Sequence, residues 1–386
     1  MRTITREEVR SHLFQAHHLV TPADSLPEAA GVCGFQNSPP GTWLCAAFNR
    51  LRSCSAWQLQ QELDEGRGIM QAWSLRGAPW IFPLHDAAVY LDALCAEEGE
   101  SWIYTNGLRC CQKEIGVPFS VLLQELMQCL QVLEKEPVVS KQRLDQVLAA
   151  AMLQRIPASL HSLWLSASPF AKGQLYGEAI VSFLLRPASF QRGIAFGPRQ
   201  KGSPTFAAFP NAASKTGGIS DAACCALVCR FLHAYGPGDV KGFAKWTGME
   251  LPQARRLWAL SEHERVSVRY QEREYSIWNK DTYEKQQTDE AVRLLSPHDP
   301  FLDLLDRSLL LEDCKLQHMV WKTVQNPGVV IQCGRICGIW RSKKRKTVNE
   351  LHITLFTDID TKSLHIWIQA YEQFLGQRIL VEISRL

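Results

Sequence analysis

The chain has 386 residues, of which 46% are hydrophobic and 21% charged, so it has room for two or three compact domains and is too apolar to be disordered. Its 42 basic and 39 acidic side chains give a net charge of only +3, and this small surplus does not by itself identify a nucleic-acid-binding protein. Residues 291–386 hold 13 basic and 10 acidic side chains, so the C-terminal quarter carries the whole surplus.

No stretch approaches the roughly 18 apolar residues of a membrane span, and the start of the chain is too polar for a signal peptide. The thirteen cysteines are odd in number and include the adjacent pairs Cys110-Cys111 and Cys224-Cys225, which is a poor disulfide framework. We therefore expect a cytoplasmic protein with no membrane partner, in which most cysteines are buried thiols.

The first hundred residues follow a pattern of helices and then a β-ribbon. Thr5-Arg-Glu-Glu8 is a capping-box sequence, and the apolar residues after it recur at helical spacing. This pattern favours a winged helix over residues 1–105. The predicted elements are helices at 5–19, 43–51 and 55–65, and strands at 70–76 and 80–82.

The same order of elements recurs twice, which predicts winged helices over residues 106–215 and 216–290. The middle unit has predicted helices at 118–134, 140–154 and 173–185, followed by short strands marked by Phe190, Ile194, Phe196, Phe206 and Phe209. The third unit has predicted helices at 221–235, 239–246 and 252–260 and a tight hairpin at 266–270 and 275–278. A helix-turn-helix with a hairpin is a module that docks on nucleic acid.

The last unit, residues 291–386, has an α/β pattern with a helix at 362–375 and strands at 329–340, 350–356 and 379–383. The predicted class of the whole chain is therefore α+β, with three tandem winged-helix domains and a C-terminal α/β segment that contains a basic β-hairpin.

Two segments rich in basic residues are candidate DNA contacts. Five of the six residues from Arg341 to Lys346 are basic, at the tip of a predicted hairpin, where they suit phosphate contacts. Residues 179–220 also contain basic but no acidic side chains. A solvated loop that discourages edge-to-edge aggregation is the alternative interpretation of the first segment. The predicted DNA-binding residues are Arg341, Lys343, Lys344, Arg345, Lys346, Arg192, Arg199 and Lys201.

The sequence predicts no metal ion and no cofactor. The spacings Cys225-x3-Cys229 and Cys333-x3-Cys337 lack the close pairing of zinc sites, and there is no glycine-rich phosphate loop. His298 beside Asp299 is compatible with a proton relay, but a loop histidine next to an aspartate more often makes local hydrogen bonds. Gln36-Asn37-Ser38, just ahead of Pro39-Pro40, is a weak motif alone, because such side chains usually form turns or cap helices.

Taken together, the chain resembles the AlkZ/YcaQ family of bacterial winged-helix proteins, which includes DNA glycosylases that excise alkylated or crosslinked bases. The resemblance runs over nearly the whole chain and rests on the order and spacing of several short motifs. These are Gly34-Phe-Gln36, Trp73-Ser-Leu-Arg76-Gly77, Gly236-Pro237, Trp246-Thr-Gly248, Leu294-Leu-Ser-Pro-His-Asp299-Pro300, Arg307 and Gly338-Ile-Trp340-Arg341.

The resemblance implies three winged helices arranged as a C around duplex DNA, and a catalytic motif of Gln, an apolar residue, and Gln or Asp. This motif falls on Gln36, Asn37 and Ser38, which we take as the predicted catalytic residues. The second and third positions differ from the family pattern, and Trp80 stands where the family often has His.

Three interpretations remain open: a monofunctional glycosylase for alkylated purines, a DNA-binding regulator or damage sensor without catalysis, and a protein-interaction scaffold. The first two expect double-stranded DNA, alkylated or crosslinked, as the partner of a monomeric protein. Trp43 and Trp73 are candidate stacking partners for an extruded base, although their spacing favours core packing.

Overall fold

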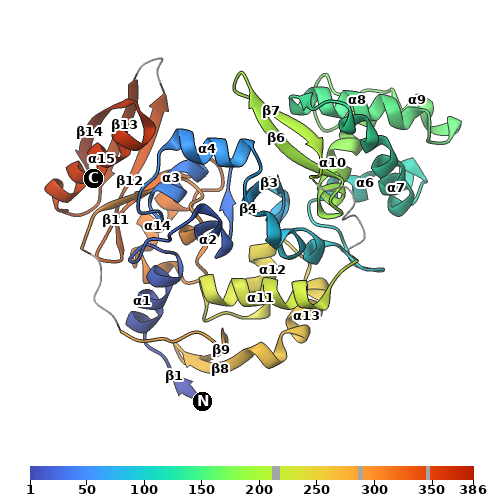
Figure 1. Ribbon diagram of the computed structural model, residues 1–386. Coiled ribbons are helices and arrows are strands. Elements are labelled where there is room, and N and C mark those ends of the chain that lie inside the picture. Colours follow the sequence, from blue (N-terminus) through green and yellow to red (C-terminus); the bar gives the residue numbers. More distant parts are fainter. Residues whose placement is uncertain (211–217, 286–289, 345–347) are drawn as a thin grey trace.

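The protein has a mixed α+β fold, which confirms the predicted class (Figure 1). The computed structural model describes residues 1–210, 218–285, 290–344 and 348–386. Its strands form three three-stranded sheets and one five-stranded sheet within these ranges. Arg345 and Lys346 of the first basic segment and Lys215 of residues 179–220 lie outside the described residues.

The first sheet, in the order β2-β4-β3, is antiparallel and carries the candidate motif at its edge. The predicted capping box is confirmed, because the Thr5 side chain accepts a bond from the Glu8 amide and Glu8 bonds back to Thr5. The predicted strand at 70–76 is too long: β3 ends at Trp73, and Arg76 has a φ of +57°, which breaks the extended chain. The elements are α1 (Arg6–Ala16), α2 (Leu26–Gly31), β2 (Phe35–Gln36), α3 (Thr42–Phe48), α4 (Ala56–Asp64), β3 (Ile69–Trp73), β4 (Pro79–Pro83) and α5 (Ala87–Tyr90).

The second sheet, β5-β7-β6, packs against helices from the middle of the chain. The predicted strand at Phe190 is wrong, because the last helix continues through Pro187 and ends at Phe190. Phe190 is fully buried there, so packing overrides the helix-breaking tendency of proline. The elements are α6 (Asn106–Ile115), α7 (Phe119–Cys129), β5 (Val138–Val139), α8 (Lys141–Leu153), α9 (His161–Trp164), α10 (Tyr176–Phe190), β6 (Ile194–Gln200) and β7 (Ser203–Ala208).

The third unit agrees most closely with the predicted elements. Its first helix, α11, spans Asp221–Tyr235 as predicted, and α12 is followed by Gly248, whose φ of +81° suits a glycine cap. The sheet gains a strand from the other end of the sequence, because β1 (Arg2–Thr3) pairs in parallel with β8. The remaining elements are α12 (Val240–Thr247), α13 (Leu251–Leu260), β8 (Arg265–Tyr270) and β9 (Arg273–Trp278).

The C-terminal sheet has the order β10-β11-β12-β13-β14, and α15 connects the parallel strands β13 and β14. The strand predicted over 329–340 is two strands, because Cys333 and Gly334 both have positive φ values and form a turn. The elements are β10 (Arg293–Leu295), α14 (Cys314–Val320), β11 (Gly328–Gln332), β12 (Arg335–Lys344), β13 (Val348–Leu355), α15 (Thr361–Leu375) and β14 (Arg378–Arg385).

Buried side chains from units that are far apart in the sequence pack together. The largest hydrophobic cluster combines side chains from α1, the first sheet, α11 to α13 and the C-terminal sheet. A second cluster joins α3 to α15, whereas the third is formed mainly by the helices and sheet of residues 106–208. The first, third and last units therefore pack as one body around the motif.

The thirteen cysteines are all free thiols, of which six are buried. No single helix in the described ranges has the length and apolar character needed to cross a membrane. Residues 106–115 and 119–134 meet that test only as a pair, and the two are bent by 104°.

Candidate active site

A short edge strand places Gln36 at the border of the core. In β2, Phe35 is buried and Gln36, which faces Trp80 of β4 in the sheet register, is half-buried, as expected from alternation along a strand. Gly34 precedes the strand with a φ of +71°, and a Cβ atom there would lie 2.8 Å from the Trp80 ring. A glycine at this position therefore lets the strand approach Trp80.

Asn37 and Ser38 have different surroundings from Gln36. Asn37 is buried, its Nδ2 donates to Gln71 Oε1 at 3.1 Å, and its Oδ1 accepts from the Gly41 amide at 2.7 Å. Both polar atoms of Asn37 thus hold the turn. Ser38 is half-buried, and within the described ranges its hydroxyl has no hydrogen-bond partner.

Arg76 connects Gln36 to a carboxylate from the far end of the sequence. Its Nη2 donates to Gln36 Oε1 at 3.0 Å and to Asp303 Oδ2 at 2.8 Å, and its Nη1 donates to the Trp246 carbonyl at 2.9 Å. The guanidinium carbon lies 5.3 Å from the centre of the Trp80 ring. We call Gln36, Arg76 and Asp303 the bridged cluster.

The bridged cluster is accessible to solvent and surrounded by further polar groups. The side chains of Arg76 and Asp303 are 29% and 27% exposed. Burial lowers the pKa of nearby His298, and the positive charge of Arg76 lowers it further, whereas Asp303 acts in the opposite direction. His298 is therefore a neutral imidazole at pH 7, next to an accessible ion pair.

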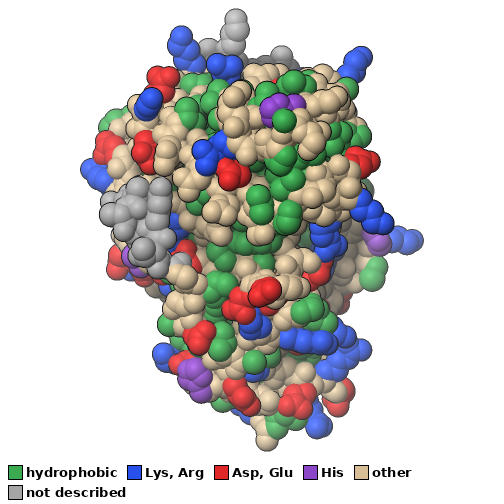
Figure 2. All heavy atoms as spheres, turned by 90° about the vertical axis from the view of Figure 1, so that its right-hand side faces the viewer, with side chains coloured by type: hydrophobic (Ala, Val, Ile, Leu, Met, Phe, Trp, Pro, Cys, Tyr) green, Lys and Arg blue, Asp and Glu red, His purple; other side chains and the backbone are tan. Residues whose placement is uncertain are grey.

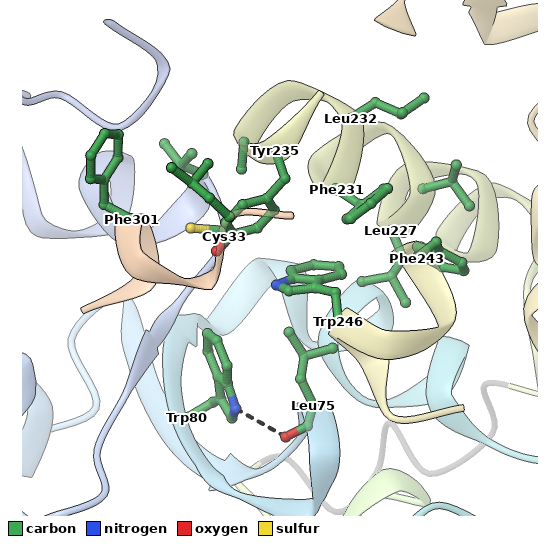
Figure 3. Packing of buried hydrophobic residues seen from close by; sticks show 14 of the residues in the cluster. Cys33, Leu75, Trp80, Leu227, Phe231, Leu232, Tyr235, Phe243, Trp246 and Phe301 are labelled. Atoms are coloured by element: carbon green, nitrogen blue, oxygen red, sulfur yellow. Dashed lines mark hydrogen bonds between the residues drawn. The ribbon is translucent and has the colours of Figure 1, made fainter. Parts of the chain in front are cut away.

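Buried aromatic side chains lie next to the bridged cluster. Figure 3 shows Trp80 below Trp246, with the Trp80 indole donating to the Leu75 carbonyl at 3.1 Å. Trp80, which stands where the family often has His, is fully buried; its ring packs against Arg76, and its one polar atom is bonded to Leu75. Trp43 and Trp73 are also buried, and Trp73 stacks on Phe206, so both belong to the core.

Asp299 is held by a different arginine. Arg50 donates to both carboxylate oxygens of Asp299 at 2.7 and 3.0 Å, and both side chains are buried. Asp299 also accepts from the Phe301 amide at 3.0 Å, which makes it a local cap. These hydrogen bonds give Asp299 a structural role. They do not include His298, so they do not form the proton relay that the sequence was compatible with.

The predicted DNA-binding residues fall into two groups. Arg192 is 15% exposed, and its guanidinium binds the Asp92 carboxylate at 2.6 and 2.7 Å, so it holds the second sheet against the first unit. Arg199 and Lys201 lie exposed at the end of the β6-β7 hairpin, and Arg341 and Lys343 lie exposed on the β12-β13 hairpin. Lys344 ends β12, and Arg345 and Lys346 lie outside the described residues.

The two hairpins project from the same side of the molecule, with α4 between them (Figure 1). Figure 2 shows the face over α8 and α9, where basic, acidic and apolar side chains are interspersed. The hairpin side, where Arg199, Lys201, Arg341 and Lys343 are exposed, is the better candidate for a polyanion.

A second polar cluster lies near the third sheet. His12, His233 and Asp281 bring one ligand atom each to within 4.8 Å of one another. His233 Nδ1 is 2.7 Å from Asp281 Oδ1, and His12 Nε2 is 2.9 Å from the His233 carbonyl oxygen. Because the carbonyl oxygen can only accept a hydrogen bond, His12 Nε2 carries the hydrogen and has no lone pair for a metal ion.

The sequence pointed to Gln36 but missed the carboxylate beside it. Arg76 entered only as part of a family motif, and Asp303 was not singled out. Asp303 and Arg76 are 227 residues apart, so no local pattern links them. The signal available in the sequence was the position of Asp303 three residues beyond the motif Leu294–Pro300, which the family resemblance had already marked.

Comparisons with known proteins identify the family and a solved structure of similar fold. The family model described as DNA glycosylase AlkZ-like matches residues 29–374. Among solved structures, the chain is similar to the Streptomyces sahachiroi DNA glycosylase AlkZ, with a TM-score of 0.73, 18% identity and coverage of 100% of both chains. No curated protein sequence matches the chain.

Proposed function

Because this chain belongs to the AlkZ-like DNA glycosylase family, we propose that it hydrolyses the N-glycosidic bond of alkylated purines in duplex DNA, as a monofunctional glycosylase. The observation that carries the proposal is the position of the Gln36 amide. It is half-buried and hydrogen-bonded to an accessible ion pair, and the arginine of that pair packs on the buried ring of Trp80.

The chemistry of the substrate explains why an amide suffices. An N7- or N3-alkylated purine is cationic and leaves readily, so the protein has to position a water molecule and stabilise positive charge on the sugar. A carbonyl oxygen has two lone pairs. Arg76 occupies one lone pair of Gln36 Oε1, and the other is available to the water or to the developing charge at C1′.

We propose that the β6-β7 and β12-β13 hairpins contact the DNA backbone. Arg199, Lys201, Arg341 and Lys343 are exposed and belong to the hairpins that project from one side of the molecule. Lys344, Arg345 and Lys346 extend the same basic segment in the sequence. Arg192 is left out of this interface because Asp92 occupies its guanidinium.

The proposed arrangement is three winged helices that curve as a C around the duplex, in a monomeric protein. Three sets of helices, each followed by a β-hairpin (β3-β4, β6-β7 and β8-β9), support the division at residues 105, 215 and 290. A crosslinked duplex is a further substrate within the same proposal, since it presents the same alkylated purine to the site.

Incubation of the protein with a duplex that contains one N7-methylguanine tests the proposal. We expect abasic sites to accumulate, and an undamaged duplex of the same sequence to stay intact. Gln36→Ala is expected to lower the single-turnover rate by about 100-fold, the size of effect that removal of one oriented polar group has in other enzymes. Release at the wild-type rate by Gln36→Ala would remove Gln36 from the mechanism.

The second candidate function is DNA binding without catalysis, favoured by the serine hydroxyl at position 38 and the buried indole of Trp80. It predicts salt-sensitive binding of damaged duplex and no base release from any alkylated substrate. The same incubation, combined with a binding measurement, separates the two candidates.

A further inference from the structure

We propose that Asp303 is a catalytic carboxylate of this site and that it supplies the charged oxygen that Ser38 does not. The inference rests on the proposed function, because it assigns a residue to that same reaction. It also explains how a chain with serine at the third position of the motif retains an acidic group near Gln36.

The argument starts from the geometry of Arg76. A single atom, Nη2, donates to Gln36 Oε1 at 3.0 Å and to Asp303 Oδ2 at 2.8 Å. The amide oxygen and the carboxylate oxygen therefore lie on either side of one nitrogen atom. A water molecule beside Arg76 can therefore lie within hydrogen-bond reach of Gln36 Oε1 and of the Asp303 carboxylate, whose Oδ1 is not bonded to Arg76.

The availability of Asp303 distinguishes it from the neighbouring acids. Its side chain is 27% exposed, and in the described part of the chain its Oδ1 has no hydrogen-bond partner. Asp299 is buried against Arg50. Asp306 accepts bonds from Tyr270 at 2.8 Å and from the Ser308 hydroxyl at 2.5 Å. Asp306 is about as exposed as Asp303, at 25%, but both of its oxygens carry hydrogen bonds, so Asp303 is the exposed carboxylate of the three that keeps an oxygen for the water.

Two residues that interact with the Asp303 side chain have an uncommon backbone conformation. Arg76 and His298 have φ values of +57° and +58°, in the left-handed region that non-glycine residues rarely adopt. Such conformations cost energy and tend to occur at functional sites. Of the two, Arg76 holds the Asp303 carboxylate by a hydrogen bond of 2.8 Å, which orients Asp303 before substrate binds.

The proposed step balances as a hydrolysis. The bond between C1′ and the purine nitrogen breaks, and its electron pair goes to the base, which leaves neutral. Positive charge then lies on the sugar, opposite the Asp303 carboxylate. The water oxygen forms the new bond to C1′, and the proton that it loses passes to Asp303 Oδ1 and then to solvent. Gln36 Oε1 orients the same water.

Arg76 is a positioning residue in this scheme. It contacts Asp303 through one nitrogen and one carboxylate oxygen, which leaves the other oxygen for the water. Its second nitrogen is fixed by the Trp246 carbonyl at 2.9 Å, and the indole of Trp80 lies under its guanidinium. These contacts orient the guanidinium between the two oxygens.

The test is the single-turnover rate of N7-methylguanine release by Asp303→Asn, with Asp306→Asn as the matched control. Asparagine keeps an oxygen for Arg76 but cannot accept the proton, so we expect a loss of about 100-fold. Affinity for an undamaged duplex is expected to stay within twofold. Asp306→Asn is expected to keep the wild-type rate, and Asp303→Glu to release base faster than Asp303→Asn.

The outcomes separate this inference from the function it rests on. If the wild-type protein releases no base, the proposed function fails. If the wild-type protein releases base and Asp303→Asn does so equally fast, the assignment of Asp303 is overturned and the function stands. A slow Asp303→Asn beside a normal Asp306→Asn supports the assignment.

Discussion

At the scale of single residues, the structure separates two aspartates that the sequence places four positions apart. Asp299 is buried with Arg50, and Asp303 is accessible and bonded to Arg76. The first contact holds α3 to the C-terminal unit, and the second completes a polar site. The two aspartates differ in burial and in the arginine that each one binds, and both properties depend on long-range packing.

Arg50→Met is expected to lower the free energy of unfolding by about 3–5 kcal/mol, because it leaves the Asp299 carboxylate charged and buried without its partner. Urea denaturation at pH 7 measures the effect. Arg52→Met is the matched control, since Arg52 and its partner Asp24 are both largely exposed. A loss of stability as large in Arg52→Met as in Arg50→Met would contradict the structural role of the buried pair.

Stability is expected to fall as the pH drops below the ordinary pKa of histidine. Burial lowers the pKa of His17 well below its usual value, and the charge of Arg50 lowers it further. Below about pH 6.5 the unfolded chain therefore binds a proton that folded His17 does not, which favours unfolding. Burial also lowers the pKa values of His12, His18 and His298.

The measurement is the free energy of unfolding at pH 7.5, 6.5 and 5.5 in the wild-type protein and in His17→Gln. Glutamine can still donate to the Ala234 carbonyl that His17 contacts at 2.8 Å. We expect the wild-type slope to exceed the His17→Gln slope by up to about 1.4 kcal/mol per pH unit. Equal slopes would show that His17 does not titrate differently on folding.

Some residues of the site could be predicted from the sequence. Others could not, because their roles depend on contacts between distant parts of the chain. Gln36 was found because its neighbours match a family pattern. Asn37 was placed with it, but its amide bonds to Gln71 and Gly41 and holds the turn. Asp303 was missed because its contact with Arg76 depends on how distant units pack.

At the scale of elements, helices with a capping sequence or a clear apolar spacing were predicted correctly. The capping box at Thr5 and the apolar spacing of α11 gave helices where the structure has them. The sequence did not predict the helix correctly where tertiary packing determines its extent or its existence. α10 continues through Pro187, and α6, which includes Gly107 and lacks a side-chain cap, was not predicted.

The β12-β13 hairpin is expected to contribute to DNA affinity through its charge. Arg341→Ala with Lys343→Ala removes two exposed positive charges, so the slope of log affinity against log salt is expected to become shallower by about 2. Fluorescence anisotropy over a series of salt concentrations measures this slope.

The control for the hairpin is Arg269→Ala with Arg273→Ala. These arginines are exposed on the β8-β9 hairpin, which lies on the opposite side of the molecule in Figure 1. Removing the same number of charges there is expected to leave the slope unchanged. A larger effect from β8-β9 than from β12-β13 would move the DNA interface to the third unit.

At the scale of the whole molecule, the site forms where separate units meet. Gln36 and Arg76 come from the first unit, the Trp246 carbonyl from the third, and Asp303 from the C-terminal unit. Buried contacts reinforce the junction: the Trp367 indole donates to Asn49 at 3.0 Å, and Asn49 donates to the Leu294 carbonyl at 2.9 Å. The sequence predicted a tandem arrangement of units. It did not predict this junction, because the residues that form it are far apart in the sequence.

The central claim is that Gln36 and Asp303 act on the same water molecule, and a double-variant cycle tests it most directly. Single-turnover release of N7-methylguanine is measured for wild type, Gln36→Ala, Asp303→Asn and the double variant. If both groups serve one water, the double variant is expected to be about as slow as the slower single variant. Losses that multiply in the double variant, or single variants that release base at the wild-type rate, would contradict the account.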